Sequence, residues 1–61
     1  MENVLARAAR YRTKAHEARV IAENQKDART KDTLLGVAAD YLHMADALER
    51  MEAQNPPKGG P

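Results

Sequence analysis

The segment Leu34–Glu49, LLGVAADYLHMADALE, decides the fold because its apolar residues cover more than half of a helix's circumference. One stripe of it repeats at alternating steps of four and three residues, the heptad spacing of a helix packed on another helix. This stripe consists of Leu34, Ala38, Tyr41, Ala45 and Leu48. More large apolar residues flank the stripe, Leu35 and Leu42 on one side and Val37, Met44 and Met51 on the other. A face this wide needs more than one neighbouring helix.

A second apolar stripe with the same alternation lies upstream. It consists of Val4, Ala8, Tyr11, Ala15, Ala18 and Ala22. The next position of that stripe is residue 25, and Leu34 lies nine residues further on. At about 100° per residue, the two stripes would face opposite sides of one continuous helix. The chain therefore predicts a break, with Asn24 ending the first helix and Asp27 capping the second through the amides of its first turn.

The predicted fold is all-α, an antiparallel two-helix hairpin over residues 1–54, with helices at about 3–24 and 28–53. Residues 55–61, NPPKGGP, are expected to be a disordered tail. Antiparallel pairing also brings a basic cluster beside an acidic one, so that they offset each other. The clusters are Arg7, Arg10, Arg12 and Lys14, and Asp40, Asp46, Glu49 and Glu52. A turn near residue 26 places Tyr11 level with Tyr41, and we expect both to be packing residues.

The small size of the available core predicts self-association. The 61 residues include no Phe, Trp or Cys, and only five Leu, three Val, one Ile and three Met. Such a core rarely contributes more than about 3–5 kcal/mol, and neither a disulfide nor a cysteine zinc site can add to it. We expect a homodimeric four-helix bundle or a tetramer, and another protein's helix is the alternative occupant of the wide face. The predicted interface is Leu34, Leu35, Val37, Ala38, Tyr41, Leu42, Met44, Ala45, Leu48 and Met51.

A wider set of positions carries a resemblance to a family. The set is Tyr11-Arg12, Ala15, Glu17, Ala22-Glu23, Asp27, Leu34-Leu35, Ala38, Tyr41, Met44-Ala45 and Glu49. Over about residues 11–49 this pattern resembles short helical-hairpin proteins of alphaproteobacteria, rhizobia especially. Those relatives often have Cys where this chain has Ala18, and Pro where it has Ala28, so no thiol role carries over. The resemblance implies the hairpin and implies no activity.

The motifs of this chain favour neither an enzyme nor a metal site. No nucleophile–base pair, phosphate-binding loop or buried carboxylate pair is evident, so we expect a non-enzymatic protein without a cofactor. Asp40 and His43 have the acid-x-x-His spacing of metal-binding bundles, but both fall at outer heptad positions, as does His16. Gly36 also lies at an outer position, which leaves open whether a partner approaches it closely.

The alternative function is nucleic-acid binding by a helical-hairpin dimer, by analogy of architecture with the plasmid RNA-binding protein Rop. Its contacts would be Arg7, Arg10, Arg12, Lys14 and Arg19. A net charge of +1 does not by itself demand such a partner. No apolar run approaches the roughly 18 residues of a membrane span, and MENVLARAAR lacks the order of a signal peptide. We therefore expect a cytoplasmic protein without a membrane partner. A third hypothesis is a subunit that folds fully only in the groove of a larger protein.

Overall fold

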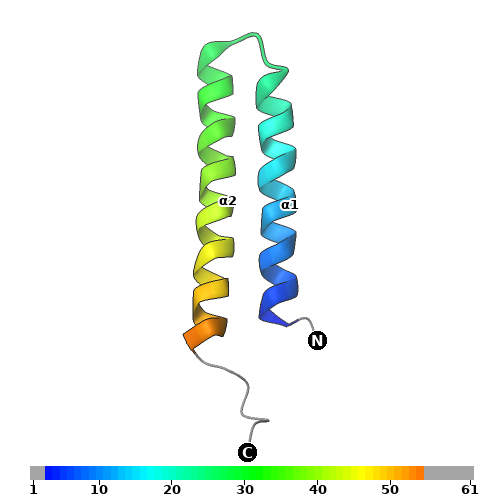
Figure 1. Cartoon of the computed structure of the whole chain (residues 1–61). Coiled ribbons are helices and arrows are strands. Elements are labelled where there is room, and N and C mark those ends of the chain that lie inside the picture. Colours follow the sequence, from blue (N-terminus) through cyan, green and yellow to red (C-terminus); the bar gives the residue numbers. More distant parts are fainter. Residues whose placement is uncertain (1–2, 55–61) are drawn as a thin grey trace, which may run out of the picture.

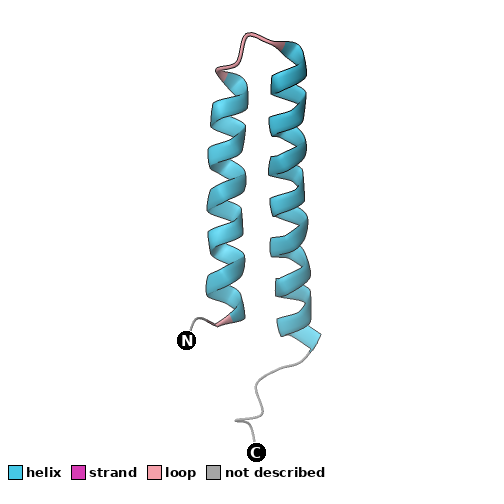
Figure 2. Ribbon diagram, turned by 180° about the vertical axis from the view of Figure 1, so that it is seen from behind, coloured by secondary structure: helices cyan, strands magenta, loops and turns pink. Residues whose placement is uncertain are grey.

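Two helices form the described part of the molecule. A computed structural model describes residues 3–54, in which α1 (Val4–Glu23) and α2 (Ala28–Gln54) run antiparallel side by side (Figure 1). Residues 3–54 contain no strand (Figure 2). Their sequence is rich in helix-forming residues, with no proline and a single glycine. The predicted all-α fold is confirmed, and each helix ends within one residue of its expected boundary. The expected tail, residues 55–61, lies outside the described residues.

Asparagines hold both ends of α1. The Asn3 side chain caps the helix start by accepting a hydrogen bond from the Ala6 N–H at 2.7 Å, a cap that the sequence analysis missed. Asn24 is the C-cap, as predicted. Its backbone N–H donates to the Ile21 carbonyl at 3.1 Å, and its side-chain Nδ2 donates to the Val20 carbonyl at 2.9 Å. These bonds satisfy carbonyls of the last turn that have no partner within the helix.

Asp27 starts α2 in the way that the sequence predicts. Its Oδ2 accepts hydrogen bonds from the Thr30 backbone N–H at 3.0 Å and from the Thr30 hydroxyl at 2.8 Å. No described residue has a positive φ, so the turn between the helices does not need the left-handed conformation that favours glycine. This explains how a turn forms from Asn24, Gln25, Lys26 and Asp27 alone.

The core between the helices is made of alanine. Its buried residues are Ala8, Ala15, Ala18, Ala22, Ala38 and Ala45, each at most 7% exposed. Tyr41 and Leu42 pack against this core from α2, and both remain half-buried. Tyr11 and Tyr41 stack with ring centroids 5.9 Å apart, at the equal height that the turn position predicts. Among residues 3–54 no large side chain is fully buried, because small alanines fill the contact between the helices.

One ion pair crosses from helix to helix near their open end. Arg12 Nε donates to Glu49 Oε2 at 3.1 Å, and Arg12 Nη2 donates to Glu49 Oε1 at 2.5 Å. Asp46 pairs instead with Arg50 of its own helix at 3.0 Å. The Arg12–Glu49 pair thus joins the predicted basic and acidic clusters in a bidentate contact. Neither helix is long and apolar enough to cross a membrane.

Candidate protein-interaction surface

The position of α1 divides the wide apolar face of α2 into two flanks. Ala38 and Ala45, which the sequence analysis placed in the oligomer interface, are 2% and 0% exposed inside the hairpin. They are buried in the seam with α1, which leaves them almost no surface for contact with a second molecule. Leu34, Tyr41 and Leu48 are half-buried in the same seam. The exposed large apolar residues of α2 therefore lie on either side of α1.

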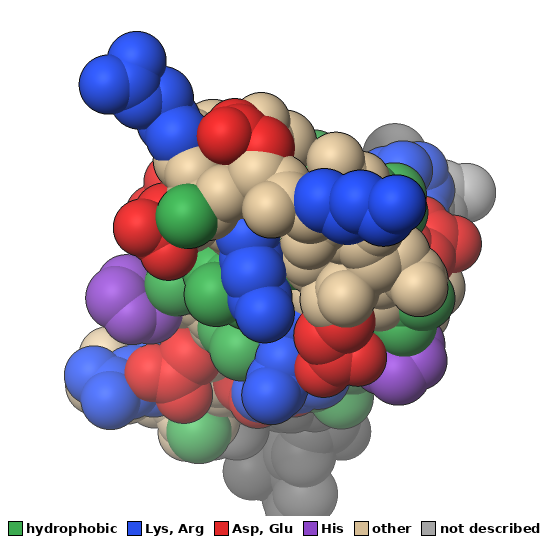
Figure 3. Space-filling model, turned by 90° about the horizontal axis from the view of Figure 1, so that it is seen from above, with side chains coloured by type: hydrophobic (Ala, Val, Ile, Leu, Met, Phe, Trp, Pro, Cys, Tyr) green, Lys and Arg blue, Asp and Glu red, His purple; other side chains and the backbone are tan. Residues whose placement is uncertain are grey.

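The larger exposed group lies on one side, which we call the methionine flank. It consists of Ile21 from α1 and Val37, Met44 and Met51 from α2, exposed by 50%, 38%, 44% and 55%. Arg7 and Tyr11 of α1 and Met44, Ala47 and Leu48 of α2 line a hollow of about 220 Å³ on this flank. Around Met44, the flank is therefore built from both helices. Viewed down the hairpin from the turn, hydrophobic atoms reach the surface between charged side chains (Figure 3).

Each helix contributes one further stripe to the methionine flank. These stripes are Arg7, Arg10, Lys14, Glu17 and Ile21 on α1, and Val37, Asp40, Met44, Ala47 and Met51 on α2. Both alternate steps of three and four residues, so each runs along one side of its helix. The stripe of α1 is mainly basic, whereas that of α2 is mainly apolar. Ile21 was absent from the predicted interface, although its place at the end of the α1 stripe is the signal that could have revealed it.

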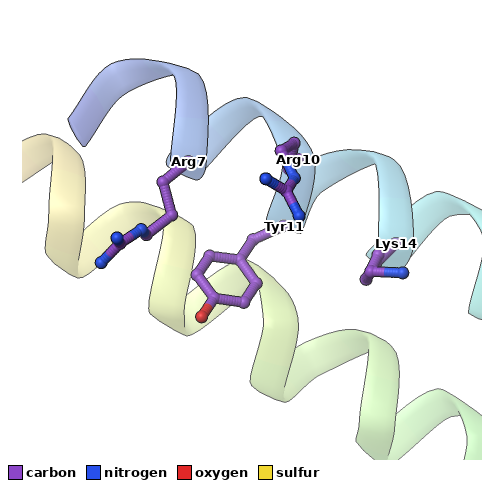
Figure 4. Close-up of a pocket in the computed structure, with 4 residues that line it drawn as sticks. All are labelled: Arg7, Arg10, Tyr11 and Lys14. Atoms are coloured by element: carbon purple, nitrogen blue, oxygen red, sulfur yellow. The ribbon is translucent and has the colours of Figure 1, made fainter. Parts of the chain in front are cut away.

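Three basic residues gather around Tyr11 on the same flank. Arg7, Arg10, Tyr11 and Lys14 line a hollow of about 240 Å³ (Figure 4). Arg7 and Tyr11 reach over α2, whereas Arg10 and Lys14 stay close to α1. We call Arg7, Arg10 and Lys14 the basic cluster. The positive charge of this cluster, next to the phenol ring of Tyr11, suits an anionic or acidic neighbour.

The opposite side, which we call the ion-pair flank, is more polar. Arg19 and Leu35 line a shallow hollow there together with Leu42, which is already half-buried against the core. The Arg12–Glu49 pair spans the helices on the same side. The hydrogen bond from Arg12 lowers the pKa of Glu49, and the same bond raises the pKa of Arg12. This pairing keeps both groups charged. Leu35, 39% exposed, is the exposed large apolar residue that α2 contributes to this flank.

This division changes the predicted nucleic-acid contact. The sequence predicts one set of contacts, made of Arg7, Arg10, Arg12, Lys14 and Arg19. The hairpin places Arg7, Arg10 and Lys14 on the methionine flank, whereas Arg12 is bound to Glu49 and Arg19 lies beside Leu35 and Leu42 on the other flank. The five cations therefore do not form one surface. Arg7 and Arg12 are five residues apart, as are Lys14 and Arg19, and five residues correspond to about 140° around a helix.

The histidines lie where the sequence places them, on outer faces. His16, His43 and Asp40 are all exposed. Within residues 3–54, no three His, Cys, Asp or Glu side chains come close enough together to hold a metal ion. Among these residues, Asp40 and His43 therefore have no third side chain beside them that could complete a metal site.

The chain matches no protein-family model, no curated protein and no solved structure. The resemblance to helical hairpins of alphaproteobacteria therefore stays a prediction.

Proposed function

We propose that this protein is a small non-enzymatic interaction protein that acts by self-association of its helical hairpin into a homodimeric four-helix bundle. The observation that carries the proposal is a mismatch between what the hairpin buries and what it exposes. Six alanines form the buried core, while the four large side chains of the methionine flank remain in water.

The energetics of burial support this proposal. Fully burying an exposed Val, Leu, Ile or Met side chain contributes roughly 1.5–3 kcal/mol, and the four side chains of the methionine flank, 38–55% exposed, have about half of that burial still to gain. An exposed apolar surface rimmed by polar residues is typical of a protein contact site. A second copy presents the same four residues, and a two-fold dimer buries both sets at once. Met44 and Met51 suit such a contact because the flexible thioether adapts to its neighbours.

The mass in solution tests the proposal directly. We expect light scattering over a dilution series to give twice the chain mass at micromolar concentrations, with high helicity. Met44→Glu should shift this protein towards the monomer because it places a charge in the proposed interface. Leu35→Glu is the matched control, since Leu35 is 39% exposed and Met44 is 44% exposed, on opposite flanks of the same helix. A Met44→Glu protein that keeps the wild-type mass would refute the interface.

The substitution Leu42→Glu is less informative about assembly. Leu42 packs against the hairpin's own core, so a glutamate there weakens the hairpin whether or not it assembles. We expect Leu42→Glu to lower helicity strongly, and this result alone would not identify the assembly surface.

The alternative proposal is Rop-like binding of RNA or DNA, now through the basic cluster alone. It is favoured by the gathering of Arg7, Arg10 and Lys14 around Tyr11. Gel-shift titrations at two salt concentrations test it, because true phosphate contacts weaken steeply with salt. Arg7→Glu combined with Lys14→Glu should abolish such binding, and Arg19→Glu on the ion-pair flank is the control. Equal binding by all variants, or none by the wild type, would exclude this alternative.

A further inference from the structure

We infer that the two hairpins of the dimer lie with their turns at the same end, so that α1 of each copy packs against α2 of the other. This inference rests on the proposed self-association through the methionine flank. It names the arrangement of the second copy, which the charges on the flank determine.

The two helices present different chemistry to a second copy. On the methionine flank, α1 offers the basic cluster with Glu17 and Ile21, whereas α2 offers one carboxylate, Asp40, among apolar side chains. A two-fold axis perpendicular to the helices would set α1 against α1 and bring two basic clusters together. A two-fold axis along the helices sets α1 against α2, so that cations meet a carboxylate and methionines. Like charges across an interface are costly, which favours the second arrangement.

The register of the hairpin supports the same arrangement. Because Tyr11 stacks on Tyr41, Lys14 lies at the height of residue 38, between Val37 and Asp40. An axis along the helices preserves these heights, so Lys14 faces Asp40 of the second copy. Arg7 comes level with Met44 in the same way, as their shared hollow within one hairpin shows. Its aliphatic stem can then cover the thioether while the guanidinium stays in water.

The same register of the two helices disfavours the dimer with the perpendicular two-fold axis. Its best apolar contact pairs the α2 stripes about Met44, with Val37 of each copy against Met51 of the other. That choice places the axis at the height of residue 8 on α1, since Tyr11 and Tyr41 are level. The Arg7 side chains of the two copies would then lie beside each other. The apolar contact and the charges therefore conflict in this arrangement, whereas the parallel one sets cations against a carboxylate and methionines.

A spin-label distance measures the arrangement. The described chain and the full sequence contain no cysteine, so Lys26→Cys in the exposed turn gives one label per copy. Turns at the same end place the two labels less than about 30 Å apart, given the 8–10 Å spacing of packed helices. Turns at opposite ends place them about 40 Å apart or more, because a 27-residue helix rises 1.5 Å per residue. Dilution with unlabelled protein should remove the distance peak.

A charge exchange provides the second readout. Lys14→Asp and Asp40→Lys should each raise the dimer dissociation constant about fivefold, because each places like charges opposite one another in two symmetric contacts. The double variant should return the dissociation constant to near the wild-type value. Arg19→Asp is the control, since it changes the charge equally on the ion-pair flank and should leave the constant unchanged.

The outcomes separate the two proposals. A monomeric protein at all concentrations would overturn the self-association and this arrangement together. A dimer with labels about 40 Å apart or more, or a double variant no better than its parents, would overturn the arrangement and leave self-association standing. A short distance with rescue by the double variant would establish both.

Discussion

At the scale of single residues, the Arg12–Glu49 pair is a polar link between the two helices. It is bidentate and joins residues 37 positions apart in the chain. The sequence predicted that opposite charges meet at this end. It could not predict this particular pair, because long side chains reach past their nearest neighbours, and Asp46, an equally plausible partner, binds Arg50 instead.

This pair predicts a specific acid dependence. Its hydrogen bonds lower the pKa of Glu49 below the value in the unfolded chain. A group with a lowered folded pKa adds stability above its unfolded pKa, about 4.3, and loses it as the pH falls through the folded value. The melting temperature of Glu49→Gln should therefore lie below the wild-type value at pH 7, and the two should converge at acid pH. Thermal melts by circular dichroism at a series of pH values test this.

The Asp27 cap serves as the comparison for that experiment. Hydrogen bonds from Thr30 lower the pKa of Asp27 as well, so its contribution to stability disappears over a similar acid range. Asp27 remains in both proteins, so only the Glu49 contribution should separate their curves. A constant difference between wild type and Glu49→Gln down to the lowest pH would contradict the assignment to ionised Glu49.

At the scale of the helices, periodicity predicted the seams because the heptad spacing fixes which residues face a neighbouring helix. The alanines of the α1 stripe and Ala38 and Ala45 of α2 are buried accordingly. The split of the wide α2 face into two flanks did not follow from the sequence. It depends on where α1 packs on that face. Because apolar residues lie on both sides of the stripe, the sequence does not determine this position. Asn3 as a cap was predictable from its place before the first apolar residue.

Gly36 gives the prediction at this scale. A Cβ added there would meet no atom within 4 Å, and its φ is not positive, so Ala fits without strain. Gly36→Ala should raise the free energy of unfolding by about 0.5–1 kcal/mol per chain through the lower entropy of the unfolded chain. Urea denaturation measures this. The solution mass should not change, because Gly36 lies outside the methionine flank, and a loss of dimer would instead indicate close approach of a partner at Gly36.

At the scale of the whole molecule, the structure raises the question of how so small a core remains folded. Residues 3–54 bury no large side chain completely, and four large apolar residues of one flank face water. In such a molecule folding and association should be one process, because the interface supplies burial that the hairpin lacks. The same reasoning applies to the third hypothesis, in which a larger protein supplies the missing surface.

Coupled folding and association predict that stability depends on concentration. Mass action favours the dimer as protein concentration rises, so the melting temperature should increase with each tenfold rise in concentration. Circular dichroism melts from about 1 to 100 μM would show this shift for the wild type and for Leu35→Glu. Met44→Glu should be poorly helical throughout that range, since its hairpin is left without the second copy. A wild-type melting temperature independent of concentration, together with a helical monomer, would mean that the alanine seam alone sustains the fold, and the methionine flank would then be a surface for a different protein.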